Sequence, residues 1–260
     1  MKKTLFLAML TAFTLSACGG GGSDVKTNQS VNQVIIYQTN KDGTALNFNQ
    51  KPQTAAGNDG THFTTLKIGN RSIPLDNGEI YQTHYGDKLI LSEGDDYLSL
   101  SLATAYARFG IAGIAGAIGQ PDKLAFFYQG NPTPIADMEK QKGNNVKYTG
   151  DAIAVRLGDY NIETMSGAEE LANNIFVGRT NLTVDFDEKK INGNIGNWQG
   201  YGFANDVDIK ADIKANTFTG TANSTGAVEG KFYGANAQNM AGAFHDKSQK
   251  LQGIFGGTKQ

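Results

Sequence analysis

Cys18 is the residue whose type and position point most directly to a chemical modification. It is the only cysteine of the chain, and residues 15–17, Leu-Ser-Ala, precede it directly, as in a bacterial lipobox. Lys2 and Lys3 give the N-terminus a positive charge, and the apolar stretch behind them is too short to span a bilayer. We therefore predict a lipoprotein signal peptide over residues 1–17 and lipidation of Cys18. The alternative is an ordinary secretory peptide that contains a cysteine by chance.

A flexible tether is expected directly after the lipidated cysteine. The sequence GGGGSD follows Cys18, and glycine and serine favour a flexible coil, so residues 18–30 would form a lipidated tether. Acyl chains such as palmitate would anchor it in a membrane almost permanently, at about 0.8 kcal/mol per buried methylene. Gly19 stands where an aspartate would retain a lipoprotein in the inner membrane of enteric bacteria. We therefore expect the protein on the outer membrane, exposed at the cell surface.

Two histidines in the N-terminal half could act as ligands to the iron of a haem group. His62 lies in THF and His84 in THYG, both among turn-forming residues, and an imidazole nitrogen can bind haem iron. Tyr81 and Tyr85 flank the second histidine and could pack on a porphyrin ring. For each histidine taken alone a surface or packing role is the alternative, and the tyrosines could belong to a core. His245 directly follows Phe244, which is expected to face inward, so the histidine is expected to face outward as a solvated residue.

The segment 110–119, GIAGIAGAIG, differs in composition from the rest of the chain. Glycine occupies every third position between small apolar residues, and the segment carries no charge. Because such glycine spacing disfavours a stable helix, we predict an exposed apolar loop that contacts a ligand through Ile111 and Ile114. A buried apolar strand or a turn of core helix is the alternative.

No residue pattern in the chain indicates catalysis. The sequence has no GxSxG, no HExxH, no P-loop, and no GxGxxG between a predicted strand and a helix. Lipidation would consume the single cysteine, so a CxxC metal or redox site is excluded as well. We predict a non-enzymatic protein with neither a catalytic nor a protein-bound metal site.

Composition and charge further narrow the possible classes of protein. The chain has 33 glycines, 5 prolines and a formal net charge of −2, which offers no basic surface for nucleic acid. Beyond the N-terminus no segment is long and apolar enough to cross a membrane as a helix. Abundant glycine with short polar runs favours many short strands joined by tight turns.

The C-terminal part of the chain alternates with period two, as a sheet with one buried face requires. Apolar residues or glycine occupy one face, and Lys, Asp, Thr and Asn occupy the other. Most connections are short and rich in turn formers, so neighbouring strands should pair as antiparallel hairpins. The eight predicted strands span residues 147–157, 177–187, 190–197, 206–214, 217–224, 226–233, 238–245 and 251–257.

Glycines next to aromatic residues on one face of these strands indicate that the sheet closes on itself. Gly230 shares a face with Phe232, and Gly242 shares a face with Phe244. A glycine beside an aromatic ring lets the ring lie across neighbouring backbone, which suits a narrow barrel filled by side chains. We expect no ligand cavity inside the barrel.

The sequence of this C-terminal part resembles a known family. GAVEGKFYGANAQNMAGAFHDKSQKLQGIFGG, residues 226–257, is similar to the β-barrel of transferrin-binding protein B and related surface lipoproteins. FFYQGNPTPIADMEKQKGNNVKYTG, residues 126–150, resembles the linker that enters that barrel. The chain corresponds to a single lobe, and it resembles haemophilin-like haem-binding proteins and related single-lobe surface lipoproteins more closely in size and layout. The resemblance implies export by the surface lipoprotein assembly modulator.

The same resemblance implies a β-rich handle domain ahead of the barrel. We therefore predict an all-β protein with a handle over residues 31–140 and an eight-stranded antiparallel barrel over residues 141–260. The handle is expected to pack on one end of the barrel. Its predicted strands are VNQVIIYQT, HFTTLKIG, RSIPL, KLILS, YLSLSLATAYARFG and KLAFFYQG.

Two functions follow from this reading. The first is capture of host haem, or of a haem or iron protein, at the handle and its junction with the barrel. Haem would then be the cofactor, and a TonB-dependent outer-membrane receptor would be a further partner. The second is binding of a host protein or host surface without any cofactor, as in adhesion, colonisation or binding of a complement regulator. Both need only exposed loops on a rigid scaffold.

Overall fold

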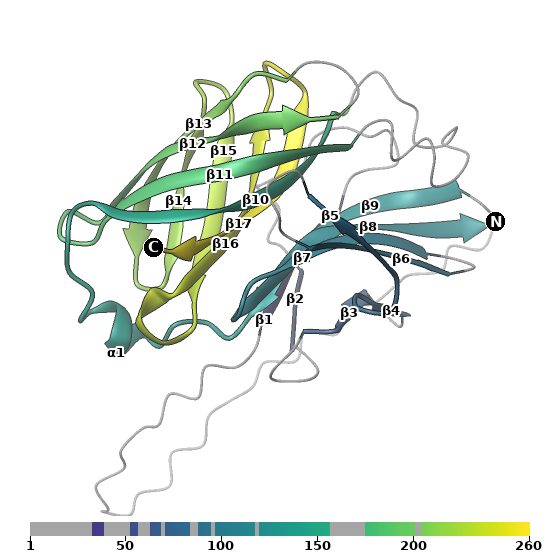
Figure 1. The fold of residues 1–260 in the computed structure, drawn as a ribbon, viewed down its shortest axis with the longest axis horizontal. Helices are drawn as coiled ribbons and strands as arrows, with labels where there is room; N and C mark the ends of the chain where they lie inside the picture. Colours follow the sequence, from purple (N-terminus) through teal and green to yellow (C-terminus); the bar gives the residue numbers. More distant parts are fainter. Residues whose placement is uncertain are drawn as a thin grey trace, which may run out of the picture.

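The protein folds into a closed β-barrel and an open β-sheet that lie side by side (Figure 1). The computed structural model describes residues 33–38, 53–56, 63–68, 71–83, 88–94, 97–117, 120–156, 175–200 and 204–260. Nearly all the regular elements in these ranges are strands, which confirms the predicted all-β class. Within these ranges no helix has the length and apolar character needed to cross a membrane.

Eight antiparallel strands close the barrel in simple sequence order, and the first strand pairs with the last. All eight lie where the period-two pattern predicts them, with ends that differ by at most two residues. The barrel strands are β10 (Val146–Arg156), β11 (Ile175–Asp185), β12 (Lys190–Gln199), β13 (Val207–Lys214), β14 (Thr217–Ala222), β15 (Ala227–Tyr233), β16 (Asn239–Asp246) and β17 (Leu251–Lys259).

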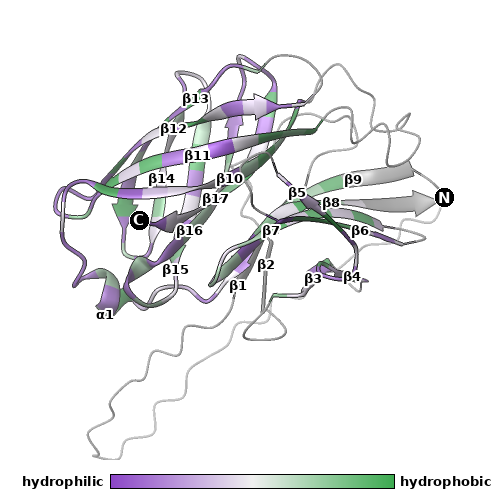
Figure 2. Cartoon of the chain, viewed as in Figure 1, coloured by the Kyte–Doolittle hydropathy of each residue, from purple (hydrophilic) through white to green (hydrophobic). Residues whose placement is uncertain are grey.

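Alternation between a buried and an exposed face fixes the register of the barrel strands. In β13, Val207 and Ile209 are buried, whereas Asp208 and Lys210 are exposed. Figure 2 shows hydrophilic and hydrophobic residues interleaved along β11 and β12 in the same way. A shift of one residue would turn the apolar set outward, so this pattern specifies the pairing.

The barrel interior is filled by aromatic rings that lie across glycine backbone. A Cβ atom built on Gly230 would lie 2.2 Å from Cζ of Phe218, and one built on Gly253 would lie 2.6 Å from Cζ of Phe244. Both rings are almost completely buried. The glycines are therefore required by close packing, as the glycine and aromatic pattern predicts.

The handle is a seven-stranded antiparallel sheet with the strand order β2-β1-β9-β8-β7-β6-β5, and a separate hairpin of β3 and β4. Strands β2 and β5 were absent from the sequence prediction, which left both segments in connections. The handle strands are β1 (Gln33–Gln38), β2 (Gln53–Ala56), β3 (Thr65–Ile68), β4 (Arg71–Pro74), β5 (Glu79–Gln82), β6 (Lys88–Gly94), β7 (Tyr97–Ala103), β8 (Ala107–Ala117) and β9 (Gln120–Gly130).

The expectation of an exposed loop over residues 110–119 was wrong. Most of this segment belongs to β8, which is the central strand of the handle sheet, and Ile111 is 1 % exposed. A Cβ atom on Gly110 would lie 2.1 Å from the carbonyl oxygen of Leu100 in the neighbouring strand. The glycine therefore permits close approach of two strands, and the segment is the buried strand that was the alternative.

The handle sheet packs face to face against the side wall of the barrel, not on its end as predicted. Phe109 and Tyr128 of the sheet share a buried apolar cluster with Ile153, Ala243 and Ile254, which point outward from the barrel. The outer face of β10, β16 and β17 is therefore covered, which is why these strands are apolar on both faces.

Aromatic rings and glycines interlock across this interface in both directions. A Cβ atom on Gly256 of the barrel would lie 2.1 Å from Cε1 of Phe109 in the handle. A Cβ atom on Gly130 of the handle would lie 2.5 Å from Cδ1 of Tyr233 in the barrel. Each domain thus packs an aromatic ring against a glycine of the other domain. This packing leaves the handle and the barrel little freedom to slide past each other.

The opposite face of the handle sheet is covered by the β3–β4 hairpin. Leu66 and Ile73 of the hairpin are buried against Phe127 of β9. The hydroxyl of Ser101 donates a hydrogen bond to the carbonyl oxygen of Leu75 at 3.1 Å. The centre of the sheet therefore lies between the barrel wall and this hairpin, and residues 107–113 of β8 and 124–130 of β9 are buried on both faces.

A short linker joins the two domains. It contains α1 (Ile135–Met138) and lies against the loop that holds η2 (Ala235–Ala237). The hydroxyl of Thr133 donates to the carbonyl oxygen of Gly234 at 2.7 Å, and Pro132 forms a bridge with Tyr233. These contacts attach the linker to the barrel near the handle.

Candidate functional site

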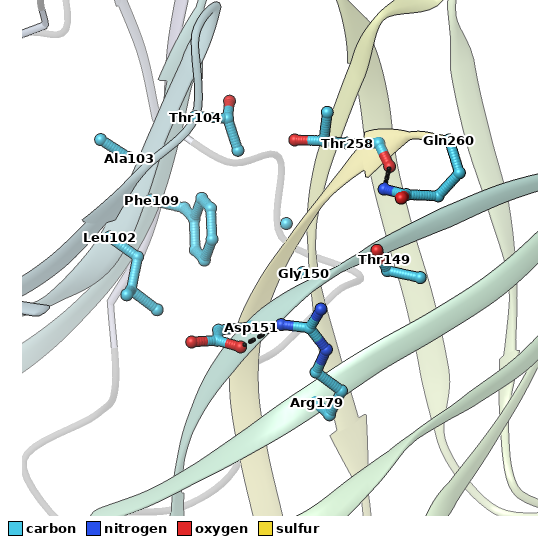
Figure 3. A pocket seen from close by; sticks show the side chains of 11 residues that line it. Leu102, Ala103, Thr104, Phe109, Thr149, Gly150, Asp151, Arg179, Thr258 and Gln260 are labelled. Atoms are coloured by element: carbon cyan, nitrogen blue, oxygen red, sulfur yellow. Dashed lines mark hydrogen bonds and ion pairs between the residues drawn. The ribbon is translucent and has the colours of Figure 1, made fainter. Parts of the chain in front are cut away.

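A cavity of about 270 Å³ opens between the handle sheet and the barrel wall (Figure 3). We call it the junction cavity. One side comes from the end of β7 and the start of β8, and the other from β10, β11, β17 and the residue after β17. It is lined by Leu102, Ala103, Thr104, Phe109, Thr149, Gly150, Asp151, Arg179, Gly256, Thr258 and Gln260.

An ion pair between a buried carboxylate and a half-buried arginine forms one wall of the junction cavity. Oδ1 of Asp151 accepts a hydrogen bond from the Arg179 guanidinium at 3.0 Å, and Oδ2 accepts one from the hydroxyl of Thr83 at 2.7 Å. Asp151 is 2 % exposed. Because both carboxylate oxygens are bonded, the buried charge is compensated. The Thr83 contact also joins the end of β5 in the handle to the barrel.

The strand β5 gives the handle an exposed edge. It is the last strand of the seven-stranded sheet and pairs only with β6 among the described residues. Ile80 is 62 % exposed and Tyr81 is 47 % exposed. The Tyr81 hydroxyl donates to the carboxylate of Glu79, and this hydrogen bond and charge raise the pKa of Tyr81. Exposed apolar residues on an open strand edge are a suitable surface for a protein partner.

The structure separates the residues that the sequence proposes as one ligand site. Ile111 lies in the core between handle and barrel, whereas Tyr81 is exposed on the sheet edge. Ile114 belongs to β8 and pairs with Tyr97 of β7 and with Lys123 of β9. Ile111 is therefore a packing residue, and the described part of the apolar segment, residues 110–113, is buried. Cys18, His62, His84 and Tyr85 lie outside the described residues.

His245 is not the solvated residue that the sequence predicts. It is 8 % exposed, and its Nδ1 accepts a hydrogen bond from the backbone N–H of Ala227 at 2.9 Å. Burial lowers the pKa of His245, the positive charge of Lys247 lowers it further, and Asp246 acts in the opposite direction. The histidine is therefore a neutral structural acceptor at the barrel end opposite the linker.

Asp246 holds the loops together at that end of the barrel. Its carboxylate accepts hydrogen bonds from Asn223 at 2.7 Å, from Gln249 at 2.9 Å and from the hydroxyl of Ser248 at 2.7 Å. Burial acts to raise the pKa of Asp246, but these hydrogen bonds outweigh it and the pKa is lowered. The network fixes two turns to each other.

Asp151 and Arg179 are the site residues that sequence reasoning missed. A signal for them was present, because Asp151 shares the outward face of β10 with Ile153 and Val155, and that face would be polar if water covered it. An apolar outward face with one carboxylate indicates a covered surface with a paired charge. Within the described residues no group of three or more His, Cys, Asp and Glu side chains could hold a metal ion.

Comparison with known proteins connects the barrel to a family. Residues 141–259 match the family described as the C-lobe and N-lobe β-barrels of transferrin-binding protein B. Transferrin-binding protein B of Neisseria meningitidis serogroup B is 29 % identical over 172 residues, which are 56 % of this chain and 28 % of that protein. An uncharacterized protein of Haemophilus influenzae is 34 % identical over 142 residues, which are 52 % of this chain and 42 % of that protein.

Solved structures extend the likeness in fold to the handle. Isotype 1 transferrin-binding protein B of Neisseria meningitidis serogroup B has a TM-score of 0.57 at 19 % identity, covering 87 % of this chain and 43 % of that one. A Trp-to-Ala mutant of the Haemophilus parasuis protein has a TM-score of 0.55 at 18 % identity, covering 87 % and 45 %. The chain spans less than half the length of these relatives.

Proposed function

We propose that this protein is a surface-displayed lipoprotein that captures a host iron-carrying protein, because its barrel matches the β-barrel family of transferrin-binding protein B. The observation that carries the proposal is the family match over residues 141–259, joined to a handle sheet in the same fold. That family is named for binding a host protein and not for a reaction. The proposed ligand is accordingly transferrin, a haem protein or a similar iron carrier.

Lipid anchoring at Cys18 is part of the proposal. The lipobox and the glycine tether would hold the folded part on the outer membrane, and export would require the surface lipoprotein machinery. A protein that captures an iron carrier at the surface must pass on its cargo, so a TonB-dependent receptor in the same membrane is the proposed partner.

The handle edge is the proposed contact with the host protein. Ile80 and Tyr81 are exposed there on a strand whose sheet is held rigidly against the barrel. A tyrosine on a rigid support offers a large contact area at a small entropic cost, and such residues are common anchors in interfaces. The exposed edge therefore supports a protein ligand without any cofactor.

Direct binding of haem is the second candidate. His84 follows Thr83 directly in the chain, and Thr83 is bonded to Asp151 at the junction cavity. The junction cavity itself is smaller than the roughly 300–1,000 Å³ of most ligand pockets and is lined mainly by polar residues, which favours the protein ligand over a porphyrin inside it.

Two titrations of the purified protein distinguish these ligands. Iron-loaded transferrin and haem proteins are tested for saturable binding on a sensor surface, and haemin is titrated while the Soret band is recorded. We expect binding of an iron-carrying protein without a haemin-induced Soret shift. A one-to-one Soret shift that His84→Ala abolishes would instead establish the haem site, and failure of all ligands would refute both candidates.

A further inference from the structure

The strands β10 and β17 stay close together where the junction cavity lies. Their register runs from Tyr148–Lys259 and Thr149–Thr258 to Ala152–Phe255 without a shift. A Cβ atom on Gly150 would lie 2.5 Å from the carbonyl oxygen of Gly256. The cavity therefore lies on the outer face of this seam, between the barrel wall and the handle.

The polar groups around the junction cavity are both donors and acceptors. Asp151 and Arg179 supply one negative and one positive charge, which compensate each other at 3.0 Å. Thr149 and Gln260 add a hydroxyl and a carboxamide. A ligand that matches such a lining is uncharged and carries groups that donate and accept at once, which is the property of hydroxyl groups.

The remaining wall of the cavity is apolar. Leu102 and Phe109 face the ion pair from the handle side (Figure 3). The volume of about 270 Å³ corresponds to roughly nine water molecules at ~30 Å³ each. A six-membered sugar ring fits this space, and it combines hydroxyl groups with an apolar face of C–H groups. A porphyrin is too large and too apolar for the same lining.

We propose that the junction cavity binds a neutral, hydroxyl-rich ligand the size of a monosaccharide, either free or as one unit of a glycan. Asp151 and Arg179 form a rigid polar wall, and Thr149 is available for a direct hydrogen bond because its hydroxyl has no side-chain partner among the described residues. The proposal goes beyond the proposed function and does not depend on it, since binding of a sugar unit requires no host iron carrier.

Ligand-observed NMR and calorimetric titration test this site. The full chain is purified in a detergent without a sugar headgroup and in buffers without glycerol, and D-glucose, D-galactose and N-acetylneuraminate are the probes. We expect saturable binding of a neutral sugar with a dissociation constant of roughly 1 mM or below. Thr149→Val should weaken it about fivefold, by removing one hydrogen bond while keeping the side-chain shape.

Thr219→Val is the matched control, because Thr219 is exposed on the outer barrel wall in β14. It should leave sugar binding unchanged. Absence of saturable binding, or equal effects of the two valine substitutions, would overturn the proposal and leave a water-filled cavity. Preferred binding of the anionic N-acetylneuraminate would overturn the assignment of a neutral ligand. Circular dichroism spectra of both variants exclude misfolding as the cause of any loss.

Discussion

Replacing Gly242 by alanine should destabilise the barrel, because no room exists for one additional carbon atom. The Cβ atom would lie 2.3 Å from the carbonyl oxygen of Glu229, 2.9 Å from Cζ of Phe255 and 3.0 Å from Cα of Gly230. Two of these atoms are backbone of the paired strand β15 and cannot rotate away. Relieving such overpacking typically costs about 1–3 kcal/mol.

Gly257→Ala provides a matched control in the same barrel. There the new Cβ atom would lie 3.3 Å from Cβ of Tyr148 and 3.6 Å from Cγ of Met240, which are near-normal contacts with side chains. We expect the melting temperature of the Gly242 variant to fall by roughly 2–12 °C, at about 2–4 °C per kcal/mol for a chain of this size. Thermal unfolding followed by circular dichroism measures both variants. Equal melting temperatures would refute the argument that ring-on-glycine packing fills the barrel.

Three further predictions concern the interface, the pH dependence and the anchor. Gly256→Val should force Phe109 off the barrel wall and make the linker between β9 and β10 more susceptible to limited proteolysis, whereas an unchanged digestion pattern would speak against a tight interface. Burial lowers the pKa of His245 below its value near 6.5 in the unfolded chain, so the unfolded chain binds more protons and stability should fall as the pH drops below 6.5. His245→Asn keeps an acceptor for the backbone N–H of Ala227. This variant should show a weaker dependence of melting temperature on pH between pH 7.5 and 5. Cys18→Ala should abolish palmitate labelling in cells, and persistent labelling would exclude Cys18 as the lipidated residue.

The barrel could be predicted from sequence because most of its strands have one buried face. In β13 the alternation of Val207, Asp208 and Ile209 is clear, and such strands are defined by local pattern alone. Strand β10 was also predicted, but the packing of the handle sheet on its outer face was not. The residues that cover this face come from a distant part of the chain. The outward-facing Ile153 packs against the handle, but the sequence of β10 alone does not identify the handle as its partner.

The handle was harder to predict, since the residues of its central strand follow neither the period of two of a half-buried strand nor the period of 3.6 of a helix. Glycine at every third position of residues 110–119 suggested a loop, yet Gly110 is required where β8 approaches Leu100. Residues 107–113 of β8 are buried on both faces, and even Arg108 is buried, so this part of the strand shows no alternation of apolar and exposed polar residues. The edge strand β5 is only four residues long and all four residues are exposed, so no buried face marks it as a strand.

The residues that the sequence proposes as one ligand site lie in different surroundings. Tyr81 is on the handle surface and stays a predicted ligand contact, whereas Ile111 belongs to the core. Asp151 and Arg179 come together from neighbouring strands, and Thr83 reaches them from the handle. Such a site depends on the packing of two domains, and no local sequence pattern specifies that packing.

Binding of labelled host iron-carrying proteins to intact cells tests the central claim most directly. Cells that display the wild-type lipoprotein are compared with cells that display Tyr81→Asp, or Thr219→Asp as a control on the exposed outer barrel wall. We predict saturable binding to the wild type and to the control, weakened on the order of tenfold or more by the Tyr81 change, since a charge would enter an apolar contact. No binding to the wild type, or an equal loss in both variants, would contradict capture of a host protein through the handle.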